Sequence, residues 1–90
     1  MERAVITVTG KDRTGIVAKI ANALAENDVN ILDIRQSIMD GLFTMIMLVD
    51  ISKSKKDFEV LSQELENIGE EIGVKVIIQH EDIFKYMHRI

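Results

Sequence analysis

Two amphipathic helical stretches, each flanked by stretches of alternating apolar residues, constrain this 90-residue chain more than any other feature. Alternation with a period of two is typical of strands, and apolar residues three or four positions apart indicate a helix. The first half of the chain reads as strand, helix and strand, and the second half repeats that order. The predicted elements are strands over 3–9, 29–39, 42–51 and 74–79, and helices over 15–26 and 58–72.

The dipeptide Asp40-Gly41 joins the two middle strands and predicts a two-residue hairpin, because a type I′ turn needs positive φ at both central positions. This turn pairs Met39 with Leu42 and Ile38 with Phe43. One face of the hairpin should then cover the core, and Gln36 on that face would need a polar partner. The expected core-facing side chains are Leu32, Ile34, Ile38, Phe43, Met45, Met47 and Val49.

Four residues are expected to shape the ends of the helices. Thr14 is placed to cap the start of the first helix, and Asn27 to end it in a left-handed conformation. Ser54 with Asp57 three residues later has the form of a capping box for the second helix. Gly73 would end that helix.

The element order predicts an α+β, ferredoxin-like βαββαβ fold. Right-handed crossovers place two helices on one face of a four-stranded antiparallel sheet whose first and third strands are central. Residues 1–80 would form a single domain, and residues 81–90 a tail with a short helix.

Composition narrows the classes of function. The chain has no Cys, which excludes disulfides, thiolate zinc sites and thiol catalysis. The net charge of -4 disfavours nucleic-acid binding, which depends on phosphate neutralisation. No stretch is long enough to span a membrane, and no signal-peptide pattern is visible, so we expect a cytoplasmic protein.

The histidines and lysines do not change this interpretation. His80 and His88 lack metal-ligand spacing, and we expect them to be solvated. The Lys53, Lys55 and Lys56 cluster is expected to be a solvated connector, since the sheet face without helices carries no aromatic residue to stack a base. No nucleophile–base pair is visible, so the chain is not expected to be an enzyme or to hold a metal or cofactor.

The segment between Gly10 and Gly15 is the candidate ligand site. Ile16-Val17 stands where a nucleotide-binding loop would need Lys and Ser or Thr, which argues against nucleotide hydrolysis. The start of the following helix still suits a carboxylate, Asp12 could hold an ammonium group, and Asn30 offers donors and an acceptor. Alternatively, Asp12 and Thr14 only cap the helix and Asn30 satisfies a turn.

The predicted sheet face without helices carries more apolar residues than a solvated face needs. They are Val5, Ile31, Ile46, Leu48 and Ile77. Either the apolar side of the tail or a second copy of the chain could cover them, and we favour self-association. The second strand, at the edge of the sheet, offers another route to a homodimer.

Three segments resemble the ACT domain family: residues 9–17 (Thr-Gly-Lys-Asp-Arg-Thr-Gly-Ile-Val), 30–33 (Asn-Ile-Leu-Asp) and 43–49 (Phe-Thr-Met-Ile-Met-Leu-Val). The likeness covers about residues 3–80 and is greatest to stand-alone ACT proteins. It extends to the ACT domains of the glycine cleavage system transcriptional repressor and of formyltetrahydrofolate deformylase. Many relatives have Pro where this chain has Thr14.

The resemblance implies a ferredoxin-like fold and regulatory binding of an amino acid or similar ligand, often at a dimer interface. The regulated protein would be a separate chain. An alternative is a protein-interaction module without a small ligand. Carried over, the ligand-binding residues would be Lys11, Asp12, Arg13, Thr14, Gly15, Ile16, Asn30 and Ile31.

Overall fold

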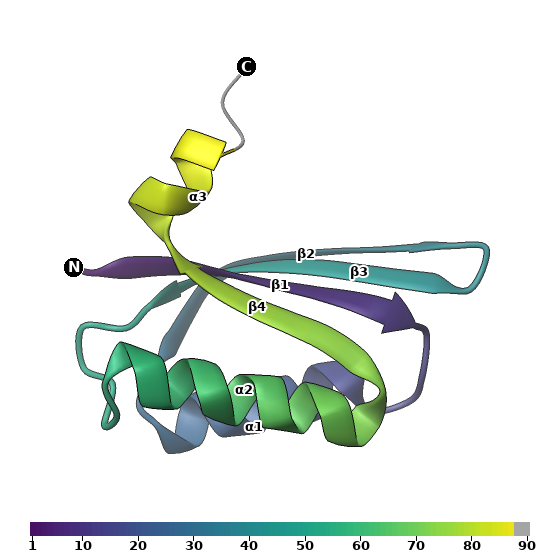
Figure 1. Cartoon of the computed structure of the whole chain (residues 1–90), viewed down its shortest axis with the longest axis horizontal. Helices are drawn as coiled ribbons and strands as arrows, with labels where there is room; N and C mark the ends of the chain where they lie inside the picture. The colour runs from purple at the N-terminus through teal and green to yellow at the C-terminus, as the bar shows by residue number, and fades with distance from the viewer. Residues whose placement is uncertain (88–90) are drawn as a thin grey trace.

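The computed structural model describes residues 1–87 as a four-stranded antiparallel sheet with two helices on one face and a third on the other (Figure 1). The strand order β2-β3-β1-β4 puts β1 and β3 at the centre, which confirms the predicted fold. The elements are β1 (Arg3–Lys11), α1 (Ile16–Glu26), β2 (Asn30–Met39), β3 (Leu42–Asp50), α2 (Phe58–Ile72), β4 (Val74–His80) and α3 (Glu81–Met87).

The β2–β3 hairpin has the predicted turn and register. Asp40 and Gly41 have φ of 50° and 82°, and Ile38 pairs with Phe43. The hairpin tip extends beyond the helices (Figure 1), which leaves Ile38 59% exposed. Gln36 is also exposed, so the prediction that it needs a buried partner is wrong.

A β-bulge near the start of β2 overturns two predicted side-chain positions. Ile31 pairs with Val49 and Asp33 with Leu48, so one extra residue, Leu32, separates the two pairs. The bulge breaks the alternation of faces. Ile31 therefore lies on the core face, not the face without helices, and Leu32 is 37% exposed instead of facing the core.

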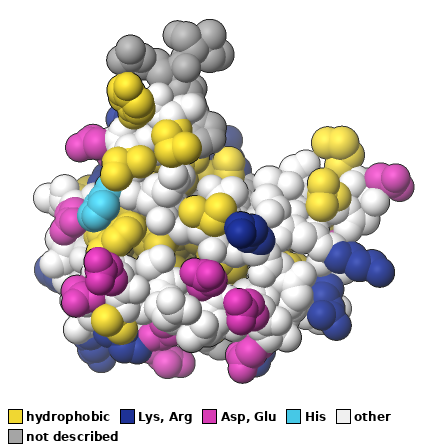
Figure 2. Space-filling model, viewed as in Figure 1, with side chains coloured by type: hydrophobic (Ala, Val, Ile, Leu, Met, Phe, Trp, Pro, Cys, Tyr) yellow, Lys and Arg dark blue, Asp and Glu magenta, His cyan; other side chains and the backbone are white. Residues whose placement is uncertain are grey.

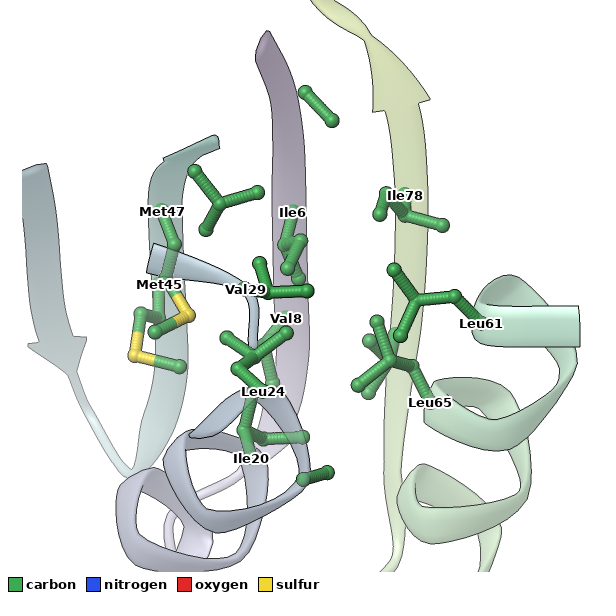
Figure 3. Close-up of a cluster of buried hydrophobic side chains, with 14 of the residues drawn as sticks. Ile6, Val8, Ile20, Leu24, Val29, Met45, Met47, Leu61, Leu65 and Ile78 are labelled. Atoms are coloured by element: carbon green, nitrogen blue, oxygen red, sulfur yellow. The ribbon is translucent and has the colours of Figure 1, made fainter. Parts of the chain in front are cut away.

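The core lies between the sheet and the layer of α1 and α2. Ile6, Met45 and Met47 of the central strands are fully buried against Leu24 of α1 and Leu65 of α2 (Figure 3). Burying one such side chain contributes about 1.5–3 kcal/mol, so this two-layer contact is the main source of stability. Phe43 and Val49 are buried as predicted.

The outer side of α2 is acidic. The helix carries five glutamates and no Lys or Arg, and acidic side chains gather over this layer in Figure 2. Asp57 is its N-cap, since the Val60 N–H donates to the Asp57 carboxylate at 2.9 Å. The predicted capping box from Ser54 is wrong, because that hydroxyl donates to the Lys56 carbonyl instead. Gly73 ends the helix with φ 80°, as predicted.

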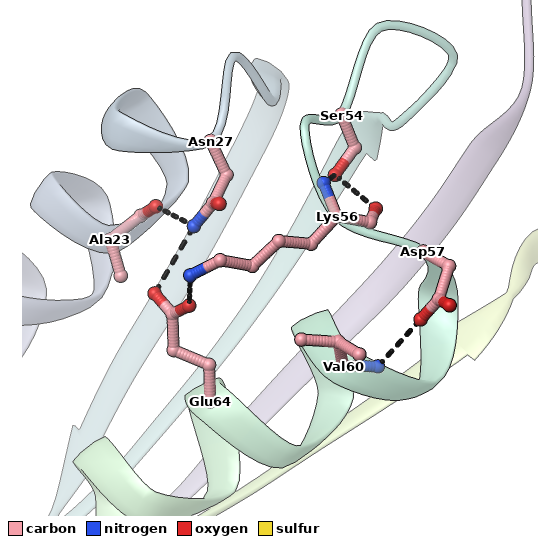
Figure 4. Close-up of polar contacts among 7 residues, drawn as sticks. All are labelled: Ala23, Asn27, Ser54, Lys56, Asp57, Val60 and Glu64. Carbon is pink, nitrogen blue, oxygen red and sulfur yellow. Dashed lines mark hydrogen bonds and ion pairs between the residues drawn. The ribbon is translucent and has the colours of Figure 1, made fainter.

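The end of α1 differs from the prediction. Asn27 has φ −101°, so it is not left-handed, and Asp28 takes the positive φ of 58°. The Asn27 side chain is instead 2% exposed, and its Nδ2 donates to the Ala23 carbonyl at 2.8 Å and to Glu64 Oε2 at 3.1 Å (Figure 4). Lys56 Nζ pairs with the other oxygen of Glu64. This Asn27–Glu64–Lys56 cluster joins the end of α1 to α2 and the β3–α2 connector.

Two glycines allow neighbouring segments to approach closely. A Cβ on Gly69 of α2 would lie 2.7 Å from the Val74 carbonyl oxygen. A Cβ on Gly10 of β1 would lie 2.9 Å from Val74 Cγ1. Both distances are shorter than real Cβ contacts, so these glycines set how closely α2 and β1 pack against β4.

Candidate functional site

The loop that joins β1 to α1 lies at the hairpin end of the sheet. Lys11 ends β1 opposite Leu42, and the Asp12 N–H donates to the Gly41 carbonyl at 2.9 Å. Lys11, Asp12 and Thr14 are exposed, whereas Ile16 is 2% exposed and anchors the start of α1 in the core. The loop thus presents polar groups above a fixed helix start.

Gly15 shapes this helix start. It is the N-cap of α1 with φ 91°, a conformation that L side chains rarely adopt. The first backbone bond of the helix runs from the Lys19 N–H to the Gly15 carbonyl at 3.0 Å. No side chain in residues 1–87 caps this end.

The prediction that Thr14 caps the helix, and the alternative that Asp12 and Thr14 serve only as caps, are therefore wrong. The N–H groups of the first turn carry the positive end of the helix dipole and lack a capping side chain. An anion can accept hydrogen bonds from such groups. In an amino acid, the group that could accept these hydrogen bonds is the carboxylate.

Arg13 is tied to the fold. Its Nη1 donates to the Ile72 carbonyl at 3.0 Å, at the end of α2. A guanidinium is favourable there, because the last carbonyls of a helix carry partial negative charge. This bond holds the loop against α2, so Arg13 is placed to position the loop.

Asn30 and Ile31 lie at the opposite end of the sheet from the loop. Asn30 pairs with Asp50, which pairs with Arg3 at the start of β1. Eight residue steps of about 3.3 Å separate that end from Lys11, or about 26 Å. Asn30 lines a depression of about 380 Å³ with Asp28 and Lys53. One chain therefore does not bring Asn30 or Ile31 to the loop.

The structure also contains a groove on the side of α2. A groove of about 520 Å³ runs between α2 and the edge strand β4, with Glu66 and Glu70 in its lining. His80 ends β4, not the tail, and its ring stacks on Phe58 with ring centroids 4.1 Å apart. Its side chain is still 38% exposed, so the predicted contact with solvent holds in part. His88 lies outside the described residues.

Residues 1–87 contain no group of three or more His, Cys, Asp or Glu side chains that could hold a metal ion. The helices within this range are all too short or too polar to cross a membrane.

Sequence comparison identifies one family. The ACT domain family model matches residues 2–79. The UPF0237 protein MJ1558 of Methanocaldococcus jannaschii is 69% identical over 90 residues, which cover 100% of both chains.

Solved structures agree with this result. The ACT domain protein from Streptococcus pneumoniae is 44% identical with a TM-score of 0.81, covering 93% of this chain and 94% of that one. A putative glycine cleavage system transcriptional repressor has a TM-score of 0.77 at 25% identity, covering 88% of this chain and 45% of that one.

A formyltetrahydrofolate deformylase from Pseudomonas syringae shares the fold, with a TM-score of 0.81 at 24% identity, over 89% of this chain and 28% of that one. The predicted resemblance is thus confirmed for each of the three kinds of relative. The chain belongs to the ACT domain family.

Proposed function

We propose that this protein is a non-catalytic regulatory module that binds an amino acid or a similar small carboxylate at the β1–α1 loop. ACT domains are typically regulatory ligand-binding modules. One observation carries the proposal: α1 begins at Gly15 without a capping side chain, beside the exposed Asp12. The helix N–H groups would receive the carboxylate, and Asp12 would hold the ammonium group.

A second copy of the chain would complete this site. Asn30 is about 26 Å from the loop of its own chain. However, β2 is an edge strand, and it can pair with its symmetry mate. Antiparallel pairing of two β2 strands brings Asn30 and Ile31 of one copy to the hairpin end of the other, where the loop lies. A ligand bridging two copies would favour the dimer, and the dimer would act on a separate protein.

Thermal unfolding with each common amino acid tests this proposal. A ligand at 100 times its Kd should stabilise the protein by about 2.7 kcal/mol. Asp12→Ala and Asn30→Ala should each abolish most of that stabilisation. Glu71→Ala, which removes an exposed carboxylate on α2, should leave it unchanged.

The amide of the same amino acid serves as a control ligand, because it tests whether binding depends on the carboxylate. It lacks the carboxylate that the helix N–H groups would hold, so it should give no stabilisation. Two results would contradict the proposed site. One is equal stabilisation by the amino acid and by its amide. The other is an amino acid that stabilises the wild type and Asp12→Ala equally.

The groove beside α2 favours a second candidate function, an interaction module that needs no small ligand. Edge strand β4 offers unpaired backbone groups there, and Glu66 and Glu70 would suit a basic segment of a partner. In that case Glu70→Lys would weaken capture of the partner, and Asp12→Ala would not.

A further inference from the structure

The sheet face opposite α1 and α2, here called the open face, carries exposed apolar side chains on its central and edge strands. Ile46 of β3 is 39% exposed and Ile77 of β4 is 43% exposed. Near the hairpin tip, Leu42 is 53% and Met39 is 72% exposed. These side chains form two exposed apolar patches, which a polar row of Ser37, Thr44 and Thr9 separates.

Helix α3 covers only one end of the open face. It packs against β1 and β4, and Val5 of β1 is buried. The helix is fixed there, because Arg3 Nε donates to Glu81 Oε1 at 3.0 Å and Gln79 Nε2 lies 3.3 Å from Met87 Sδ. Ile83 and Met87 of α3 remain 52% and 65% exposed. Helix α3 is therefore an incomplete cover for its own sheet.

The open face has a raised end and a hollow beside it. Figure 2 shows α3 standing out from the sheet and the hairpin tip projecting on the other side, with apolar side chains between them. We propose that a second copy of this chain covers the open face, sheet against sheet, and that α3 of each copy sits over the β2–β3 hairpin of the other.

Shape supports a second copy as the occupant. A twofold axis that runs between the two sheets, parallel to them and perpendicular to their strands, would place the raised helix of each copy above the uncovered half of the other. Such an interface uses one surface twice, so a projection and a hollow on that surface can fill each other. Ile83 and Met87 would then contact the apolar side chains near the hairpin tip.

The area of the open face is close to that of a stable interface. Four strands about 4.8 Å apart and about nine residues long give a flat footprint of roughly 570 Å². Side-chain relief and the flanks of α3 add to that value. A stable interface needs about 800 Å² of accessible surface on each partner, and this face approaches it.

Charge disfavours other classes of occupant. The paired middle residues of the open face, Thr7 with Ile46 and Val5 with Leu48, are uncharged, whereas Lys11, Lys75 and the Asp33–Arg35 pair lie toward its rim. A centre depleted of charged residues, with a charged or polar rim, is typical of protein interfaces. The strands carry no aromatic side chain on this face, and the net charge is -4, so neither stacked bases nor an anionic membrane is matched.

This interface is distinct from the β2 edge invoked for the ligand site and does not rest on that proposed function. Sedimentation equilibrium without any ligand tests it. Wild-type protein should have twice the chain mass, and the double variant Ile46→Lys, Ile77→Lys should have the mass of one chain. Val60→Lys is the matched control, since Val60 is 49% exposed on α2, and it should remain a dimer.

Cross-linking tests the arrangement, and the absence of Cys makes it specific. Mixing Leu42→Cys with Met87→Cys under oxidation should give mainly the mixed disulfide dimer. Three results would overturn the proposal: a monomeric wild type, an Ile46→Lys, Ile77→Lys variant that stays dimeric while folded by circular dichroism, or disulfides formed only between identical variants. Loss of amino-acid binding alone would affect only the ligand site.

Discussion

At the scale of single residues, Gly69 shows how packing reverses an inference from helix propensity. A glycine inside a helix costs about 1 kcal/mol relative to Ala, so Gly69 looks like a weak point of α2. The structure shows that this residue is buried where α2 meets β4. Gly15 is required for its backbone conformation, not for close packing. A Cβ there would have nothing within 4 Å, but the φ of 91° is one that L side chains rarely adopt.

We predict that Gly69→Ala destabilises the protein by about 1–3 kcal/mol, the range for overpacking a close contact. The added methyl would lie 2.7 Å from the backbone oxygen of Val74, which cannot move without shifting β4. Urea unfolding measures the change. Glu66→Ala, on the exposed side of the same helix, should change stability by less than about 0.5 kcal/mol. A more stable Gly69→Ala protein would show that propensity dominates.

At the scale of elements, the Asn27–Glu64–Lys56 cluster fixes the position of α1 relative to α2. Asn27 is the buried polar residue of the described core, and its two hydrogen bonds satisfy a helix carbonyl and a carboxylate from the neighbouring helix. The Lys55 N–H also donates to the Asn27 carbonyl at 2.9 Å, which fixes the connector. Removing one partner leaves a buried polar group unpaired, which costs about 1–3 kcal/mol.

We predict that Asn27→Asp destabilises the protein more than Asn27→Ala at neutral pH. The new carboxylate would be buried beside the Glu64 carboxylate, so folding would raise the pKa of the new carboxyl group. Protons then bind more tightly to the folded state, and stability should recover as the pH falls toward 5. Urea midpoints of both variants between pH 5 and 8 measure this. Parallel pH profiles for the two variants would contradict the role of Glu64.

At the scale of the whole molecule, the start of β1 lies beside the start of α3. Arg3 near the start of β1 pairs with Glu81 at the start of α3, and Lys85 Nζ lies 3.7 Å from the same carboxylate. Hydrogen bonding to Arg3 lowers the pKa of Glu81 below its ordinary value of 4.5. The last helix is thus held by charge on a face that the other helices leave open.

We predict that α3 detaches from the sheet in acid before the sheet unfolds. Because the folded pKa of Glu81 is lowered, its contribution is complete above about pH 4.5 and is lost as the pH falls through the folded value. Tyr86 is the sole Tyr and the chain has no Trp, so tyrosine fluorescence reports on α3.

Glu81→Gln controls for general acid unfolding and should remove this transition. Asp50 provides a second acid-sensitive contact, since hydrogen bonds from Ser52 lower its pKa, and it should still titrate in that variant. A wild-type fluorescence change that coincides with loss of the sheet signal by circular dichroism would contradict separate detachment of α3.

The sequence by itself determined the order of elements, the hairpin register and most of the core. Those features depend on periodicity and turn chemistry between residues close in the chain, as in Asp40-Gly41. It also located the β1–α1 loop by its glycines and its likeness to the ACT family.

Tertiary structure decided the features that depend on contacts between distant segments. The bulge at Leu32 moved Ile31 to the core face, and the pairing of β1 with β3 separated Asn30 from the loop. Asn27 became the buried link between α1 and α2, and α3 was held on the open face by Arg3. Strand pairing and helix packing bring together residues that no local pattern relates, so only the folded chain shows which partner each polar group has.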